Sequence, residues 1–238
     1  SDLTVANAVP SFARGGSEVL GRSRQLFYAD GLNQERVLVG DAASMAALSA
    51  PPAEWTGTNR PRQFVPHQGY MWGFGNMNTP HLLFRSLDTN HQDFTTTRFA
   101  IPVHSGEGDY LAAGVSFKGN LILWKYPEGV YVYDTSDADS TKWFTRKLGP
   151  GGIAGPECFC VLENDILSVD PFGGYHLISA AQEFGNVRSE DISARKLGRK
   201  IPESVNIERL KYADLRYYAD KQQAWLACSG AGQTSKQQ

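Results

Sequence analysis

Hydrophobic and polar positions along this chain form a pattern that occurs twice, 45 residues apart. Residues 114–133 and 159–178 align without a gap. Each gives an apolar run, a polar turn (118–120 or 163–165), a second apolar run, a Gly- or Pro-containing turn and a third run with aromatic residues. Strand, tight turn, strand, turn and strand make a β-meander, and a meander repeating every 40–50 residues or so is typical of a propeller blade. The pattern therefore predicts an all-β fold of the β-propeller class.

The rest of the chain supports the same architecture. A hairpin is predicted over residues 26–40, with Asp30-Gly31 in its turn. A helix is expected over residues 189–207, a highly charged region that Pro202 ends, and one or two helical turns are expected over residues 42–50 before Pro51-Pro52. Apolar runs that we place innermost in the blades recur near residues 26, 70, 121, 166 and 223. This recurrence indicates about four to five blades of antiparallel meanders.

The domain organisation follows from these runs. Residues 1–25 are polar and Gly-rich, and we expect them to form an extended N-terminal arm or connector. Residues 26–238 are expected to form the β-propeller domain. The strand at residues 223–228 leads into a Gly/Ser-rich loop without a return strand, and a strand without a partner is poorly stabilised. We therefore expect the propeller to continue beyond residue 238, so that these residues form part of a larger propeller.

Composition narrows the classes of partner. The chain has 41% hydrophobic and 20% charged residues and a formal net charge of −2, so it has material for a core and no general attraction to nucleic acid or acidic membranes. Its apolar runs are shorter than the roughly 20 residues of a membrane helix. We expect no membrane partner and no specific nucleic acid. Basic residues are expected on solvated faces or in salt bridges between subunits; they are Arg60, Arg62, Lys142, Arg146, Lys147 and residues 195–200.

Catalytic carboxylates are the first candidates for chemistry, since some propellers are glycosidases with a carboxylate pair. The candidates are Asp109, Glu128, Asp134, Asp165 and Asp170. Four of them adjoin Gly, Pro or Asn in predicted turns, where acidic residues commonly serve the turn itself. The runs that we place innermost are apolar, so no pair is expected to converge on the central channel. We predict no catalytic residues.

Metal and cofactor sites find no support either. The five histidines (67, 81, 91, 104 and 176) are scattered without metal-binding spacing. Cys158 and Cys160 alternate on one predicted strand and should face the same side, while Cys228 leaves the count odd. We interpret these cysteines as buried thiols rather than a metal pair. No phosphate-binding loop, dinucleotide fingerprint or nucleophile elbow is present, so we predict no cofactor-binding and no metal-ligating residues.

Aromatic residues near loops have two interpretations. Trp55, Trp72 and Phe74 lie near Gly- and Pro-rich segments, where an aromatic side chain either fills a junction between blades or anchors a partner. We predict that they fill junctions.

A family resemblance rests on six segments taken in order. The segments are residues 83–95, 106–109, 115–125, 129–133, 165–177 and 217–226. Together they resemble the β-propeller structural proteins of tailed-bacteriophage virions, including tail-hub, nozzle and neck-stabilising proteins of short-tailed phages. The likeness runs from about residue 26 to the end of the chain. It lies in the order of the segments and their residue patterns rather than in an invariant motif. The Gly-His and Trp-Asp pairs of WD propellers and the sialidase-type Asp box are absent.

The resemblance implies a non-enzymatic virion component. Such a protein would form a homo-oligomeric ring in the phage tail or neck, assembled in the host cytoplasm, and would dock other tail, neck or portal-associated proteins. The resemblance implies no catalytic or ligand-binding residues in this chain. The alternative is a carbohydrate-binding or glycoside-hydrolysing β-propeller, which would use Trp55, Trp72 and Trp143 with the turn carboxylates.

Overall fold

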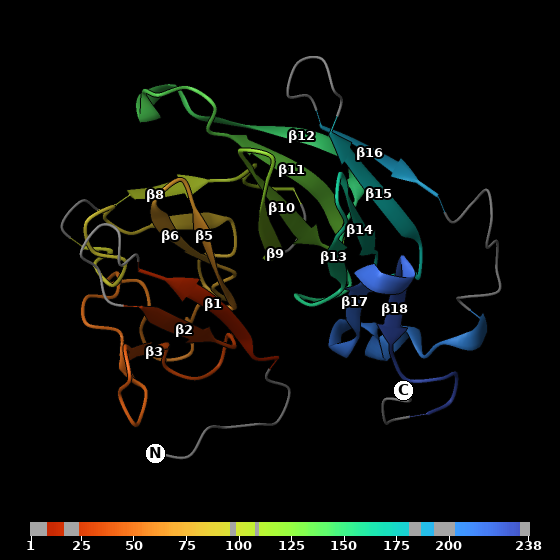
Figure 1. The fold of residues 1–238 in the computed structure, drawn as a ribbon, viewed down its shortest axis with the longest axis horizontal. Helices are drawn as coiled ribbons and strands as arrows, with labels where there is room; N and C mark the ends of the chain where they lie inside the picture. The colour runs from red at the N-terminus through yellow and green to blue at the C-terminus, as the bar shows by residue number, and fades with distance from the viewer. Residues whose placement is uncertain are drawn as a thin grey trace.

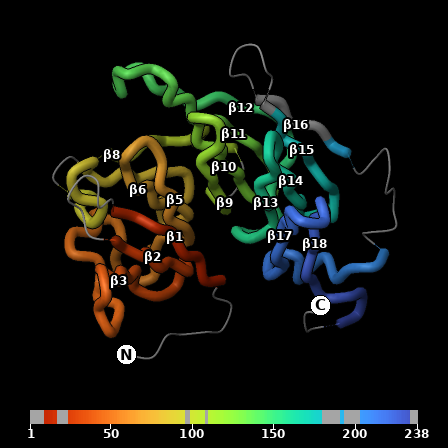
Figure 2. Tube along the Cα trace, in the orientation of Figure 1, coloured from red at the N-terminus to blue at the C-terminus, as the bar shows by residue number. Residues whose placement is uncertain are grey.

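A computed structural model describes residues 9–16, 24–95, 99–107, 110–180, 187–192 and 203–233 of the chain, with the side chains of 180 and 187–190 excepted. These residues form four four-stranded antiparallel sheets and one two-stranded sheet. The sheets follow one another around a centre in chain order (Figure 1), and the trace forms an arc around that centre from its red end to its blue end (Figure 2). The predicted all-β fold of β-propeller class, with about four to five blades, is confirmed.

Each sheet is a meander whose strands pair in chain order. The first two sheets contain β1 (Ser11–Gly15), β2 (Gln25–Ala29), β3 (Arg36–Val39) and β4 (Ala46–Ala47), then β5 (Gln63–His67), β6 (Tyr70–Phe74), β7 (Leu82–Arg85) and β8 (Phe99–Pro102). The next two contain β9 (Tyr110–Phe117), β10 (Asn120–Tyr126), β11 (Glu128–Asp134) and β12 (Phe144–Gly151), then β13 (Phe159–Val161), β14 (Asp165–Val169), β15 (Tyr175–Ala180) and β16 (Val187–Asp191). The fifth sheet pairs β17 (Asp214–Tyr218) with β18 (Gln223–Ala227), and the 3-10 helices η2 (Ser140–Lys142), η3 (Ile207–Tyr212) and η4 (Ala219–Lys221) lie in connections.

The repeated pattern in the sequence corresponds to the third and fourth sheets. Phe117 pairs with Asn120 across a two-residue turn, Lys118-Gly119, in which both residues have positive φ (48° and 80°). Such a turn matches the right-handed twist of the strands on either side of it. In the fourth sheet Val161 pairs with Ile166 around the equivalent polar turn.

The assignment of the innermost strands from the sequence is wrong. The runs near residues 26, 70, 121, 166 and 223 are the second strands β2, β6, β10, β14 and β18. First strands instead meet between neighbouring sheets, β1 with β5, β5 with β9 and β13 with β17, while the third and fourth sheets meet through β12 and β16. The second strand of the third sheet is the clearest case of an apolar strand covered on both faces, since Leu121, Ile122, Leu123 and Trp124 are fully buried in β10. The first strand β9 uses small residues, Ala112, Ala113 and Gly114, where it packs closely against its neighbours.

Two further expectations differ from the structure. Ser11–Gly15, which we expected in an extended arm, forms β1 and pairs with β2; residues 1–8 and 17–23 of that predicted arm lie outside the described residues. The helix expected over residues 189–207 begins instead with a strand, since Val187–Asp191 pairs with β15 as β16. Residues 193–202 of that helix are not among those described, and Ile207–Tyr212 is a 3-10 helix.

Hydrophobic cores lie between neighbouring sheets. Trp55, Trp72 and Phe74 are at most 1% exposed and pack in these cores, so the prediction that they fill junctions between blades is confirmed. Among the described residues, no helix has the length and apolar character needed to cross a membrane.

Candidate functional site

The propeller has two faces that carry different connections. We call the end with the turns between first and second strands, such as 68–69 and 118–119, the turn face. The opposite end carries the links between second and third strands, such as 30–35 and 170–174, and we call it the groove face.

A cavity of about 250 Å³ lies on the axis at the groove face. It is lined by side chains from the first three sheets and from the segments that precede the fourth and fifth. The lining residues are Val9, Asp30, Leu32, Arg62, Met77, Tyr110, Ala112, Ala154, Gly155, Pro156, Lys211 and Tyr212. We call this hollow the central cavity.

Arg62 is held in a fixed position at the central cavity. Its guanidinium lies 4.5 Å from the centre of the Tyr110 ring, a cation–π arrangement. Its side chain passes between Gly31 and Gly75, where an added Cβ would come within 2.7 and 2.9 Å of Arg62 carbon atoms. Both glycines also have positive φ, so the close approach and the backbone conformation each require glycine there. Among the described residues Arg62 has no ion-pair partner.

Lys211 comes from η3, and the backbone of this helix is anchored firmly. A Cβ added to Gly155 would overlap the carbonyl oxygen of Lys211, so only glycine permits the observed approach. The thiol of Cys158 lies 3.2 Å from the carbonyl oxygen of Leu210 and donates to it. The Lys211 ammonium lies 5.1 Å from the Tyr212 ring centre, and within the described part of the chain it faces no carboxylate at ion-pair distance.

Asp30 is the acidic residue of the central cavity, and its carboxylate is already saturated. It accepts hydrogen bonds from the Tyr28 hydroxyl (2.7 Å), the Leu32 amide (2.8 Å), and the Asn33 amide and side chain (2.7 and 2.5 Å). Burial opposes its ionisation, but these hydrogen bonds outweigh burial and hold the pKa of Asp30 below its usual value. The carboxylate is thus a fixed negative charge with little capacity for further donors.

A second hollow of about 260 Å³ adjoins the central cavity and is more apolar. The two share Ala154 and Lys211 in their linings. They are also joined through a stacked ring pair, since Tyr110 of the central cavity lies 5.5 Å from Tyr126 of the second hollow. The second hollow is lined by Tyr126, Pro127, Ala154, Pro171, Phe172, Ile207, Glu208, Leu210 and Lys211.

Two large apolar side chains stand exposed at the rims of these hollows. Met77 of the central cavity is 57% exposed, and Phe172 of the second hollow is 63% exposed. Flexible or aromatic apolar groups in such positions are typical of surfaces that bind partners. Together the two hollows form a groove that is cationic near the axis and apolar farther out.

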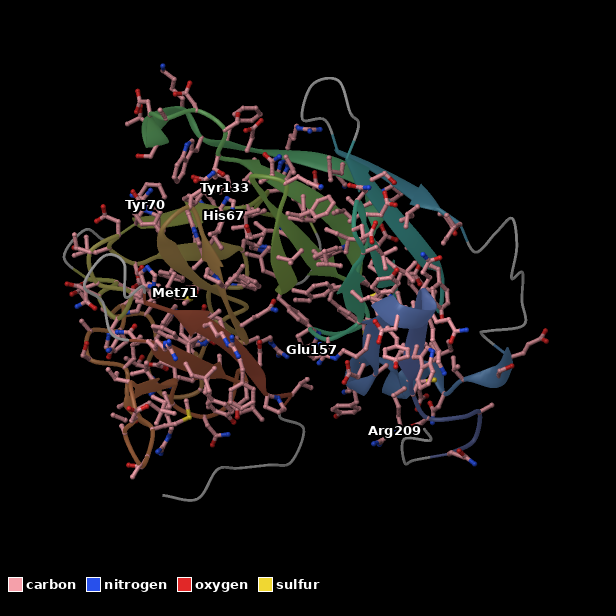
Figure 3. All side chains as sticks on the ribbon, viewed as in Figure 1. His67, Tyr70, Met71, Tyr133, Glu157 and Arg209 are labelled. Atoms are coloured by element: carbon pink, nitrogen blue, oxygen red, sulfur yellow. The ribbon has the colours of Figure 1, made fainter. Side chains whose placement is uncertain are left out.

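On the turn face, His67 connects the second and third sheets. Its Nδ1 lies 2.8 Å from the Ser116 hydroxyl and its Nε2 lies 2.7 Å from the Thr135 hydroxyl, which itself donates to the Gly119 carbonyl. Thr135 therefore accepts from His67, which places the ring proton on Nε2. Burial lowers the pKa of His67 to about 4, so the imidazole is neutral at physiological pH. Figure 3 labels His67 beside Tyr133, at the junction of these sheets.

Further contacts on the turn face join sheet to sheet. His91 accepts from the Gly16 amide (3.0 Å) and contacts the Gly69 carbonyl through Nε2 (2.9 Å). The Lys118 ammonium donates to the Asn164 side chain of the fourth sheet at 3.2 Å. Polar side chains at this face therefore link the first four sheets in series.

Arg85 is enclosed by aromatic rings near the same face. Its guanidinium carbon lies 3.9 to 5.8 Å from the ring centres of Phe99, Tyr70, Trp143 and Trp72. Trp143 follows η2 in a connection of the third sheet, so the cage links two sheets. Two of the guanidinium nitrogens, Nε and Nη1, are buried and make no hydrogen bond, because they face the rings.

A buried lysine forms a separate cluster. Lys125 is fully buried, and its ammonium donates to the carbonyl oxygens of His104 (2.6 Å) and Glu107 (2.5 Å) and lies 3.2 Å from His81 Nδ1. Burial lowers the pKa of Lys125 to about 8, and the nearby Glu107 carboxylate opposes that shift. Because backbone acceptors surround the amine, this cluster holds the link between β8 and β9 in place.

Comparisons with known proteins identify no family. No protein-family model and no curated protein matches the chain. Among solved structures, apo AztD from Citrobacter koseri is similar with a TM-score of 0.42 and 11% identity, over 76% of this chain and 46% of AztD. Myxococcus xanthus glutaminyl cyclase gives a TM-score of 0.39 and 14% identity, over 94% of this chain and 86% of the cyclase. The chain thus spans less than half the length of AztD.

The carboxylates singled out in the sequence are not brought together. Glu128 begins β11 and is exposed, Asp134 ends β11 and accepts from Ser136, and Asp165 begins β14. Asp170 binds His176 Nε2 at 2.8 Å, and its pKa is lowered because hydrogen bonds outweigh the opposing effect of burial. None of these four lines either hollow, and Asp109 lies outside the described residues.

The structure also shows where the cysteines and the basic residues named in the sequence analysis lie. Cys158 and Cys160 are free thiols in one core cluster, and burial raises the pKa of Cys160 to about 11. Within the described part of the chain, no three His, Cys, Asp or Glu side chains are grouped closely enough for a metal ion. Arg60 forms an ion pair with the buried Glu35 at 3.1 Å rather than facing solvent. Residues 195–200 are not described.

Sequence reasoning missed the residues of the groove. From the sequence, Arg62 belongs with Arg60 among basic residues expected on solvated faces or in salt bridges, Asp30 has only a turn role, and Lys211 does not stand out. Met77 and Phe172 were not identified as exposed either. The one signal in the sequence was the isolated apolar residue within a turn, as at Phe172 between Pro171 and two glycines.

Proposed function

We propose that this chain is a non-enzymatic structural component of a tailed-phage virion, part of a tail or neck ring of hub, nozzle or adaptor type that docks neighbouring virion proteins. The observation that carries the proposal is the division of polar side chains between the two faces. On the turn face, histidines, hydroxyls and an arginine join one sheet to the next. On the groove face, one carboxylate lines each hollow, Asp30 and Glu208.

This division favours a rigid docking element over an enzyme. A general acid and base must converge on the same substrate, and glycosidases need two carboxyl groups within roughly 5 to 10 Å. Asp30 has its oxygens occupied by four donors, so it is poorly suited to exchange a proton. Close packing between sheets resists deformation, while the links on one face supply a contoured surface. The resemblance of the sequence to phage propeller proteins points to the same role.

The test is native mass spectrometry of the full-length parent protein, alone and mixed with its neighbouring virion proteins. A discrete ring, or a stoichiometric complex with those neighbours, is the expected result. A stable monomer that ignores them would overturn the proposal. The same samples with oligosaccharides address the alternative, a carbohydrate-binding or glycoside-hydrolysing propeller, for which a mass shift and product release are the positive results.

The geometry gives the carbohydrate alternative little support. The rings of Trp55 and Trp72 are buried in the core and cannot stack on a sugar. Trp143 packs against Tyr70, Trp72 and Tyr133 and encloses Arg85. The described aromatic side chains named for sugar binding are thus already engaged in packing between sheets.

A further inference from the structure

The central cavity, the axial part of the groove, carries a charge imbalance that the docking role does not by itself explain. Two cations, Arg62 and Lys211, line the central cavity against one anion, Asp30, whose hydrogen-bonding capacity is filled. In the described part of the chain neither cation has an ion-pair partner. A cation that lines a concave site without a counter-ion favours an anionic ligand, and the excess of one positive charge matches a single carboxylate.

The Arg62 side chain and the backbone that carries Lys211 are both held in place before any ligand arrives. Gly31 and Gly75 leave room for the Arg62 side chain, and the Tyr110 ring supports its guanidinium. The backbone at Lys211 is pressed against Gly155. Groups held in position lose little entropy when they bind, which raises the affinity of a matching ligand.

The lining of the second hollow determines which ligand group fits beside the carboxylate in the central cavity. Its walls are mainly apolar, and the exposed Phe172 stands at its rim. Glu208 lines the same hollow, so a second acidic group there would be repelled. The groove is therefore complementary to an acid near the axis followed by an uncharged apolar side chain.

We propose that the groove face binds an extended acidic peptide segment of a partner protein, with one carboxylate between Arg62 and Lys211 and an apolar side chain in the second hollow. This inference rests on the proposed docking role and specifies the chemistry of the docked segment. An arginine guanidinium pairs with a carboxylate through two parallel hydrogen bonds, and the ammonium adds a second charge-assisted contact. A phosphate dianion or a nucleic acid fits less well, because Asp30 and Glu208 oppose additional negative charge.

The test measures fluorescence anisotropy of a short fluorescein-labelled peptide that contains one glutamate and a nearby phenylalanine, with its glutamine counterpart as the matched neutral probe. The glutamate peptide is expected to bind at least about tenfold more tightly than the glutamine peptide. Lys211→Gln should remove most of that preference, and Phe172→Ser should weaken both peptides equally. Lys142→Gln, which removes the same charge from an exposed position on the turn face, should change nothing.

Arg62→Lys keeps the charge but loses the planar fork, so it should weaken the glutamate peptide while the thermal melting temperature stays close to that of the unmodified protein. Equal affinity for the two peptides, or equal behaviour of Lys211→Gln and Lys142→Gln, would overturn the inference. So would tighter binding of inorganic phosphate or a labelled oligonucleotide at the same residues, or self-association that Lys211→Gln abolishes. Because the assay uses a peptide and a single chain, its failure leaves the ring measurement to decide the proposed function independently.

Discussion

The turn face and the groove face of this propeller differ in how far they enclose similar polar side chains. On the turn face, Arg85 is enclosed by four rings and His67 is hydrogen-bonded on both nitrogens. On the groove face, Arg62 rests on one ring and opens on a cavity. Charge or aromatic content alone would not tell these faces apart. What separates these two arginines is how far aromatic rings enclose each guanidinium.

The largest effect should come from the backbone contact that fixes the groove. Gly155→Ala would drive a Cβ into the Lys211 carbonyl, which cannot turn aside, and we expect a loss of more than about 4 kcal/mol in the free energy of unfolding. Urea denaturation measures it. The control is Gly119→Ala on the turn face, where open space surrounds the residue and only its positive φ is strained, for a loss of about 1 kcal/mol. Similar losses in the two variants would mean that the groove is not held by this contact.

The second-largest effect is a loss of stability in acid, caused by protonation of His67 at the turn face. The pKa of His67 is lowered to about 4 from an ordinary 6.5, so the unfolded chain binds the proton more tightly than the folded protein. Stability is complete above pH 6.5 and falls as the pH drops towards 4, by up to about 3 kcal/mol. Urea midpoints across this range measure the slope.

His67→Gln should flatten that slope between pH 6.5 and 4, because the titrating group is gone. His104→Gln, in a loop at the other end of the third sheet, should keep it. A slope unchanged by His67→Gln would show that another group causes the acid loss.

The extent to which the sequence predicts the molecule differs between these regions. The meander repeat and its turns, such as Lys118-Gly119, are local patterns of hydrophobicity and glycine, so they could be found without coordinates. The same reasoning placed the second strands at the axis, because it equated apolar with central, whereas the crowded axis favours small residues like Ala112. It also missed β1, whose short polar run shows no alternation strong enough to identify a strand.

The groove was harder to predict because its residues are far apart in sequence. Asp30, Arg62 and Lys211 come from a hairpin link, a loop and a 3-10 helix, and each looks ordinary in its own segment. Only the arrangement of the sheets around the axis brings them together. What the sequence can show for such a site is limited to exposed apolar residues in turns, of which Phe172 is the example.

A smaller effect compares one residue type on the two faces. Arg85→Met keeps most of the packing but removes the cation from its four rings, and we expect a loss of about 2 kcal/mol, because desolvated cation–π contacts are the strong ones. Arg62→Met should cost less than about 1 kcal/mol, since a single ring supports that guanidinium. Thermal or urea denaturation measures both. Equal losses would break the distinction between a structural arginine and one available for a ligand.

The smallest effect tests a single contact between turns. Lys118→Ala removes the 3.2 Å hydrogen bond to the exposed Asn164 side chain, and we expect a loss of only about 0.5 kcal/mol, since exposed polar contacts contribute little. Asn164→Ala should have the same small effect, and the double variant should be no worse than either single one, which a double-mutant cycle in urea would measure. Strictly additive losses would mean that the two turns do not interact. Among the described residues, the links between sheets at the turn face would then rest on the buried His67 and His91 and the half-buried Arg85.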